Sequence, residues 1–130
     1  MNITEAKLKS IFAKAKGRKI AIIGDVMLDK YVYGTISRIS PEAPVPVVDI
    51  DKTEYRLGGA ANVANNIKSL DAEPVLIGVI GNDYDSKHYL DVMKMLGLSV
   101  AGIIKDNSRP TTTKTRVIAH SQHVLRVDSE

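Results

Sequence analysis

Two adjacent glycines at the start of a helical pattern are the residues best suited to chemistry in this sequence. They lie in Gly58-Gly59-Ala60-Ala61-Asn62-Val63-Ala64. Glycine permits positive φ and lets a ligand approach bare peptide groups. The helix that follows directs unpaired N–H groups and the positive end of its dipole at the same loop. With the amide of Asn62, which donates and accepts, this segment suits an anion or a hydroxyl-rich ligand; the alternative is a plain tight turn.

Two carboxylates follow the first apolar run of the chain. Residues 20–23 are apolar at successive positions, which predicts a strand buried on both faces, as in a parallel sheet. Asp25 and Asp29 come directly after it, where ligands of open parallel sheets sit. They could accept hydrogen bonds from sugar hydroxyls or hold a cation; alternatively, Asp25 caps a turn and Asp29 lies in solvent.

Cations and histidines near the end of the chain form two weaker groups. Arg109, Lys114 and Arg116 surround a threonine run and are donors that a phosphate would favour. A solvated strand with cations at alternate positions explains them equally well. His120 and His123 lack a third metal ligand nearby, so we expect them at the surface and predict no metal site.

The elements that must position these residues alternate along the chain. An N-terminal helix capped by Asn2 or Thr4 precedes the first strand. Residues 31–57 are predicted to form an insertion of exposed, edge-type strands, because three prolines within six residues exclude a helix or a central strand. This order predicts an α/β class with a largely parallel sheet. The later elements expected are a helix at 60–70, a strand at 74–80, a helix capped by Asp85 or Ser86 and ended by Gly97, and strands at 100–104, 112–119 and 124–127.

Composition limits the class of protein. The 130 residues suffice for one domain, 1–130, and are 44% hydrophobic and 25% charged, as in soluble globular proteins. The absence of cysteine excludes a disulfide framework and fits a reducing compartment, so we expect a cytoplasmic protein. The net charge of +3 is scattered, which disfavours nucleic acid as a partner. No apolar run is long enough to predict a membrane span.

The glycine segment, followed by Ile67, Leu70 and Gly81-Asn82-Asp83, resembles the first signature of the ribokinase-like (PfkB) carbohydrate kinases. One departure is Asp71, where that family usually has Gly or Ser. Residues 24–31 and the long, specific segment 37–47 resemble the heptose 7-phosphate kinases of ADP-heptose synthesis, as do residues 113–117 and 125–128. The resemblance covers nearly everything after the first helix.

This resemblance implies a ribokinase-like three-layer α/β fold with a small β lid at 31–57, truncated after its N-terminal portion. The implied reaction is phosphorylation at C1 of D-glycero-D-manno-heptose 7-phosphate by ATP with Mg²⁺, for the lipopolysaccharide core. The implied partners are the phosphorylated heptose and a second copy paired through the lid, with no nucleic acid or membrane. The substrate-binding residues it suggests are Asp29, Gly58, Gly59 and Asn62, with Arg38, Lys114 and Arg116 as candidates for the sugar phosphate.

The catalytic motif of that family is absent from this sequence. Its base is an aspartate in a Gly-Ala-Gly-Asp helix start, and no such motif occurs here. Phosphoryl transfer depends on positioned charge and an oriented nucleophile. We therefore expect an N-terminal part of a kinase that holds no catalytic residue and is inactive alone. The alternative is a stand-alone sugar-phosphate-binding module without catalysis.

Overall fold

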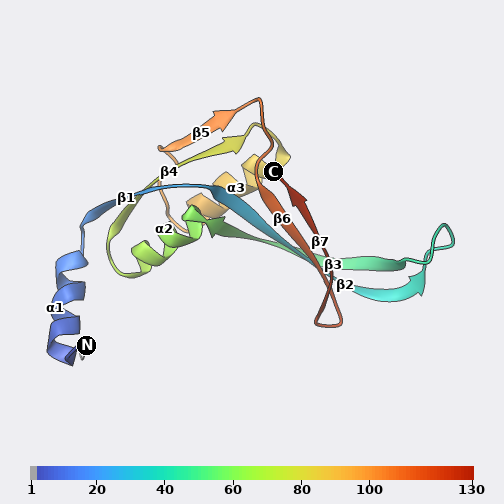
Figure 1. The fold of residues 1–130 in the computed structure, drawn as a ribbon, viewed down its shortest axis with the longest axis horizontal. Coiled ribbons are helices and arrows are strands. Elements are labelled where there is room, and N and C mark those ends of the chain that lie inside the picture. Colours follow the sequence, from blue (N-terminus) through green and yellow to red (C-terminus); the bar gives the residue numbers. More distant parts are fainter. Residues whose placement is uncertain (1–2) are drawn as a thin grey trace.

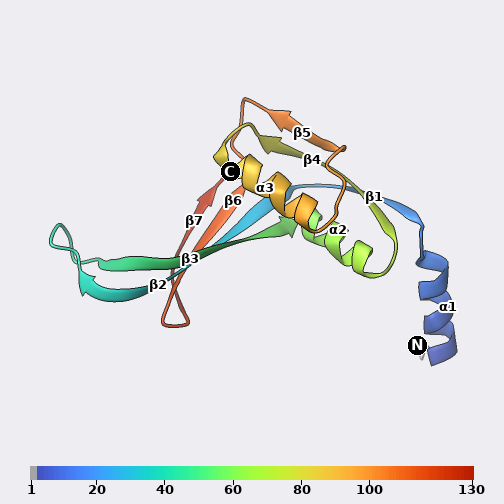
Figure 2. The ribbon, with the colours of Figure 1, turned by 180° about the vertical axis from the view of Figure 1, so that it is seen from behind.

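The elements follow the predicted alternation of helices and strands and form two sheets. The computed structural model describes residues 3–130. One sheet has the strand order β1-β4-β5 and the other has β3-β2-β6-β7. In Figures 1 and 2 the second sheet extends away from the first as a long, narrow arm. The elements are α1 (Glu5–Ala15), β1 (Lys19–Ile23), β2 (Val26–Ile39), β3 (Pro46–Gly59), α2 (Ala60–Ser69), β4 (Glu73–Gly81), α3 (Tyr84–Met95), β5 (Ile103–Asp106), β6 (Thr113–Ala119) and β7 (Gln122–Ser129).

The first sheet is parallel throughout and carries the core on one face. β4 lies in the centre and pairs with β1 and β5. Leu76 and Ile80 of β4 project toward α2 and α3, where Tyr89 and Met93 are fully buried. This core fixes the direction of α2, the helix that begins at the glycine pair. Its other buried members are Val26, Leu28, Leu57, Ala61, Ala64, Val92 and Leu98.

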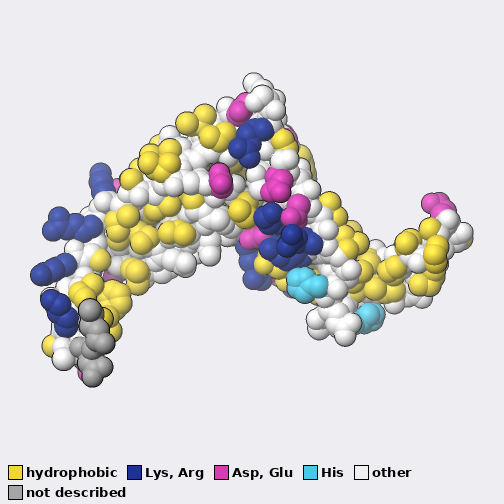
Figure 3. Space-filling view, in the orientation of Figure 1, with side chains coloured by type: hydrophobic (Ala, Val, Ile, Leu, Met, Phe, Trp, Pro, Cys, Tyr) yellow, Lys and Arg dark blue, Asp and Glu magenta, His cyan; other side chains and the backbone are white. Residues whose placement is uncertain are grey.

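The opposite face of the parallel sheet is open in residues 3–130. Ile23 is 77% exposed, and Val75, Val79 and Ile104 are also exposed. Figure 3 shows their apolar surface across the top of the molecule. The prediction that the strands are buried on both faces is therefore wrong for this face. The cause is that α2 and α3 lie on the same side, while α1 projects beyond the sheet and has no buried residue (Figure 1).

The second sheet is built on a long antiparallel hairpin. β2 and β3 have 14 residues each and pair from Val26 opposite Gly59 to Ile39 opposite Pro46. β3 is an edge strand, as predicted, and the proline-rich segment forms the turn at the hairpin tip. The hairpin begins at Val26, earlier than the expected insertion at 31–57. β6 then adds parallel to β2, and β7 antiparallel to β6, so the second sheet has four strands.

The observed helix caps agree with the predicted ones only in part. The hydroxyl of Thr4 accepts a hydrogen bond from the Lys7 N–H at 3.3 Å and caps α1, whereas Asn2 lies outside the described residues. The prediction that Asp85 or Ser86 caps α3 is wrong, because Asp83 does so and accepts from the Ser86 N–H at 2.8 Å. Asp71, the departure noted above, has a left-handed φ of 59°, a conformation that Asp tolerates better than most residues.

Candidate functional site

The glycine pair occupies a position that no larger residue fits. Gly59 has φ of +58° and is the N-cap residue of α2, with no side chain capping the helix in the described part of the chain. The N–H of Ala60 donates to the carbonyl of Asp25 at 2.9 Å, which anchors the loop to the end of β1. A Cβ on Gly58 would lie 2.6 Å from Oδ2 of Asp29. Gly58 therefore brings bare backbone against that carboxylate, and Gly59 brings it against the carbonyl of Asp25.

Asp29 is held by a cation from the neighbouring strand. Nη1 of Arg116 lies 2.5 Å from Oδ1 of Asp29, and the two side chains are only 22% and 18% exposed. The hydrogen bond to Asp29 raises the pKa of Arg116, against the opposing effect of burial. Arg116 thereby compensates the charge of the carboxylate and fixes its orientation. Oδ2, beside Gly58, stays available to accept a hydrogen bond from a ligand.

A cavity of about 370 Å³ lies beside this carboxylate. It is lined by polar groups from β2, β3 and α2 and by apolar groups from α3. A few convergent polar groups over an apolar floor are typical of small-molecule sites. The arrangement can hold hydroxyl groups through the carboxylate and two amides, and an anionic group through one guanidinium. The lining residues are Asp29, Tyr31, Tyr55, Arg56, Leu57, Asn62, Asn65, Val92, Met95 and Leu96.

The predicted site residues divide into two groups. Asp29 and Asn62 line the cavity, and Gly58 and Gly59 form the adjoining loop. Arg116 reaches it only through Asp29. The other two predicted cations, Lys114 and Arg38, do not line the cavity.

Lys114 and Arg38 are not brought to the cavity. Lys114 is opposite Asp29 in the strand register, but its ammonium binds Asp128 at 3.2 Å and Glu130 at 3.5 Å. The hydrogen bond that Lys114 donates to Asp128 raises the pKa of Lys114. Arg38 is exposed near the tip of the hairpin, where it pairs with Val47.

Arg109 belongs to a different part of the molecule from Arg116. Its guanidinium donates to Oγ1 of Thr112 at 3.0 Å, and it lines a smaller cavity of about 260 Å³ together with Asp25. The three cations near the threonine run are therefore not one cluster. Asp25 contributes its backbone carbonyl to the glycine loop, and it lines this smaller cavity instead of the one beside Asp29.

Asp83 organises the threonine run from the end of β4. Its carboxylate accepts hydrogen bonds from the N–H and hydroxyl of Thr111, at 2.7 and 2.8 Å, besides the bond from Ser86 that caps α3. Burial alone would raise the pKa of Asp83, but these hydrogen bonds outweigh it and lower the pKa. The aspartate thereby ties α3 to the segment that leads into β6.

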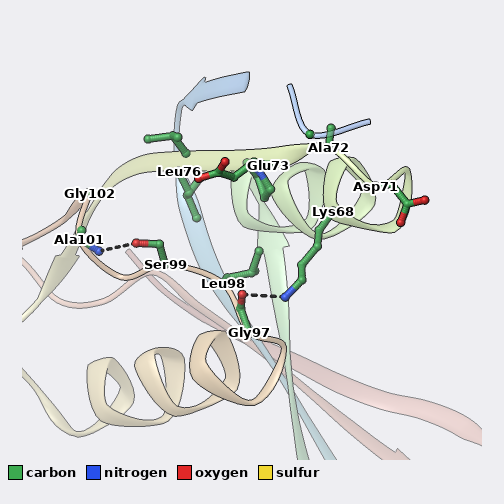
Figure 4. Close-up of a pocket in the computed structure, with 13 residues that line it drawn as sticks. Lys68, Asp71, Ala72, Glu73, Leu76, Gly97, Leu98, Ser99, Ala101 and Gly102 are labelled. Carbon is green, nitrogen blue, oxygen red and sulfur yellow. Dashed lines mark hydrogen bonds between the residues drawn. The ribbon is translucent and has the colours of Figure 1, made fainter. Parts of the chain in front are cut away.

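A second cavity of about 370 Å³ lies at the other end of the parallel sheet (Figure 4). Lys68 is directed into it, and its ammonium donates to the carbonyls of Leu96 and Gly97, both at 2.6 Å. A cation at the C-terminal end of a helix satisfies free carbonyls and stabilises the helix dipole. Lys68 thus closes the end of α3, and none of the predicted site residues lines this cavity.

The histidines and helices offer no further site. His120 and His123 are exposed, as predicted. Within residues 3–130 there is no group of three or more acidic or histidine side chains that could hold a metal ion. None of the helices in that range has the length and apolarity that a membrane span requires.

Four polar residues of the cavity were missed by sequence reasoning. Asn65 follows Asn62 at a helical spacing of three, and this spacing could have revealed it. Arg56 is opposite Asp29 in the hairpin register, and Tyr31 lies two residues along β2. Tyr55 stacks on His88 of α3, with ring centroids 4.2 Å apart. These three depend on the hairpin register, which the sequence alone did not provide.

Relatives with curated descriptions match most of this chain. It is 49% identical over 113 residues to "Bifunctional protein HldE" of Helicobacter pylori strain J99, which covers 87% of this chain and 24% of that protein. It is 45% identical over 123 residues to the protein of the same name from Geobacter sulfurreducens, covering 95% and 25%. The chain therefore spans about a quarter of the length of the curated relatives it matches.

Solved structures confirm the expected ribokinase-like α/β fold. A carbohydrate kinase from Agrobacterium tumefaciens has a TM-score of 0.69 at 18% identity, over 86% of this chain and 35% of that one. Ribokinase from Giardia lamblia has a TM-score of 0.62 at 21% identity, over 88% and 36%. The sequence profile of the pfkB family carbohydrate kinases matches residues 18–129. This chain belongs to the pfkB family of carbohydrate kinases.

Proposed function

We propose that this chain forms the sugar-binding side of an ATP-dependent kinase that phosphorylates C1 of D-glycero-D-manno-heptose 7-phosphate. The observation that carries the proposal is the convergence of Asp29, Asn62 and the Gly58 loop on one cavity. Membership of the pfkB family and the identity to "Bifunctional protein HldE" support a sugar as the acceptor. The product would serve ADP-heptose and lipopolysaccharide core synthesis.

Each polar group has a distinct role in binding the sugar. The free oxygen of Asp29 accepts a hydrogen bond from a hydroxyl, while the ion pair with Arg116 holds the carboxylate in its orientation. Asn62 binds a second hydroxyl from the first turn of α2. The glycines let the sugar approach the backbone and the N-terminal end of the helix.

ATP and Mg²⁺ would supply the phosphoryl group and neutralise its charge. The described residues do not fit a metal centre, because residues 3–130 contain no suitable group of acidic or histidine side chains. The sequence also lacks a Gly-Ala-Gly-Asp motif to provide the base. We therefore assign only the acceptor side of the reaction to this chain and predict no ATP turnover from it alone.

The lid also suggests how two copies would associate. β3 is an edge strand, and its distal half exposes Ile50 near the apolar residues Ile39 and Val45. Unpaired strand edges with apolar side chains favour pairing with another chain. We propose a homodimer through the lid. Sedimentation of the full-length protein should show a dimer that Ile50→Lys dissociates; a dimer unchanged by Ile50→Lys would contradict this interface.

Turnover by the full-length protein tests the proposed function. The full-length protein should consume ATP with heptose 7-phosphate, and the isolated 130-residue chain should not. Asp29→Asn should raise the KM for the sugar far more than that for ATP. Asp51→Asn, on the exposed part of β3, is the matched control and should change neither. Robust turnover by the isolated chain would contradict the division of the site.

The second candidate is a stand-alone module that binds a sugar phosphate without chemistry. The observation behind it is the Asp29 cavity, whose carboxylate, amides and guanidinium could bind a sugar phosphate without a reaction. The same turnover measurement separates the two functions, because a binding module retains sugar affinity but consumes no ATP in any form of the protein. A reading frame that continues into a glycine-aspartate loop would favour the kinase.

A further inference from the structure

Arg56 is the one cation that lines the Asp29 cavity in the part of the chain that the structure describes. It lies on β3, directly opposite Asp29 on β2. Residues directly opposite each other in an antiparallel pair have side chains on the same face, with Cβ atoms about 5 Å apart. Arg56 therefore presents its guanidinium to a ligand that Asp29 holds.

The guanidinium of Arg56 is positioned by an aromatic ring. It lies over Tyr31, with its Cζ 4.8 Å from the ring centroid. Arg116 approaches the same ring from β6, at 5.2 Å. Stacking on an aromatic face restricts a guanidinium to one plane and leaves its outward N–H groups free to donate. Tyr31 thus holds Arg56 at the mouth of the cavity.

The guanidinium of Arg56 can bind an anion without leaving Glu54, its present partner, unpaired. Its Nη2 lies 3.0 Å from Oε2 of Glu54, and the side chain is 59% exposed. Lys52 binds the other oxygen of Glu54 at 2.8 Å. Because Lys52 retains Glu54, the guanidinium of Arg56 is available to an incoming ligand at little electrostatic cost.

Two other cations near Asp29 already bind carboxylates. Arg116 neutralises Asp29, and Lys114 binds Asp128 and Glu130. The neutralisation of Asp29 removes the charge that would repel a phosphate at this cavity. The remaining positive charge in the lining is that of Arg56.

We infer that Arg56 binds the phosphate group of the sugar acceptor and so determines the preference for a phosphorylated sugar. This inference rests on the proposed function, because it takes a sugar phosphate as the ligand of the cavity. Guanidinium binds phosphate oxygens in a bidentate manner through a planar fork of N–H donors. Asp29 and Asn62 would hold hydroxyls at one end of the sugar while Arg56 holds the phosphate at the other.

The test compares two ligands by calorimetry on the full-length protein without ATP. One is the heptose 7-phosphate and the other is the same heptose with a free C7 hydroxyl. Arg56→Met should weaken binding of the phosphorylated sugar about tenfold to a hundredfold and leave the other nearly unchanged. Arg56→Lys keeps the charge and should recover part of the loss. Arg126→Met is the matched control, since the Arg126 side chain has a similar exposed fraction of 60% and binds a carboxylate, that of Asp128, at 3.0 Å, but does not line the cavity.

Each outcome supports or overturns the inference. Equal weakening of both ligands by Arg56→Met, or none, would overturn it, as would an equal effect of Arg126→Met. Failure of the wild-type protein to bind either sugar would overturn both the inference and the sugar site. Binding of the phosphorylated sugar that depends on Arg56, without ATP turnover, would support the inference and overturn only the kinase reaction.

Discussion

Arg116 on β6 binds the carboxylate of Asp29 on β2, with 2.5 Å between Nη1 and Oδ1. The residues are 87 positions apart in the sequence. The other oxygen of Asp29 faces Gly58 at the end of β3. One carboxylate therefore connects three strands of the second sheet to the loop that begins α2, which makes this sheet and the glycine loop one structural unit.

Breaking this pair should destabilise the protein. Arg116→Met would leave a mostly buried carboxylate without its partner, so we expect the free energy of unfolding to fall by about 1–3 kcal/mol. Urea unfolding at neutral pH measures this loss. Asp29→Asn in the Arg116→Met background should restore part of it, because the unpaired charge is removed. Purely additive effects of the two substitutions would contradict the coupling.

Gly58→Ala should damage the loop by steric overlap. The added Cβ would lie 2.6 Å from both Asp29 Oδ2 and Met27 Cγ. Overpacking of this kind costs about 1–3 kcal/mol, and displacement of the carboxylate should also weaken sugar binding. Thermal unfolding together with calorimetric titration of the sugar tests both effects. Val63→Ala, on the exposed side of α2, is the control; a Gly58→Ala protein as stable as this control would show that the loop has room.

Asp83 should make stability dependent on acid. Its folded pKa is below the ordinary value of 3.8, because hydrogen bonds from Thr111 and Ser86 favour the charged form despite burial. The charged carboxylate therefore stabilises the fold above pH 3.8, and this contribution disappears as the pH falls through the lower folded pKa. Chemical unfolding of the wild type and Asp83→Asn across this range measures it. The stability difference should be largest at neutral pH and shrink in acid; a difference that grows in acid would contradict the assignment.

Leu28→Ala tests the core at the start of the second sheet. Leu28, on β2, is fully buried, so truncation should cost about 2–5 kcal/mol. Val127→Ala, at an exposed position of β7, should change stability by less than about 0.5 kcal/mol. Urea unfolding of both variants provides the comparison. Similar losses at the two positions would mean that the core does not extend to this sheet.

Local patterns in the sequence predict most of the elements. Helical spacing reveals α2 and α3, and the prolines correctly indicate an edge strand. Burial of the sheet is predicted on two faces but occurs on one, because apolar residues at successive positions do not reveal which layers are present. The cap of α3 is missed because Asp83, Asp85 and Ser86 are all of residue types that cap helices, and residue type alone does not select among them.

The site is predictable only where its residues lie close together in the sequence or next to a predicted element. The glycine pair and Asn62 lie within five residues of each other, and Asp29 follows the end of a predicted strand. Arg56 becomes visible only when the hairpin register sets it opposite Asp29, and that hairpin contains two irregularities farther along. The ion pair between Arg116 and Asp29 depends on the parallel pairing of β2 with β6, which no short-range pattern in the sequence encodes.

The most direct test of the sugar site is Asn62→Ala in the full-length protein. Asn62 is exposed in the cavity lining, so its truncation should leave the fold intact. The KM for heptose 7-phosphate should rise about tenfold, because one hydrogen bond to the sugar is lost, while the KM for ATP stays within about twofold. An equal rise in both constants, or no rise in that for the sugar, would contradict the assignment of this cavity to the acceptor.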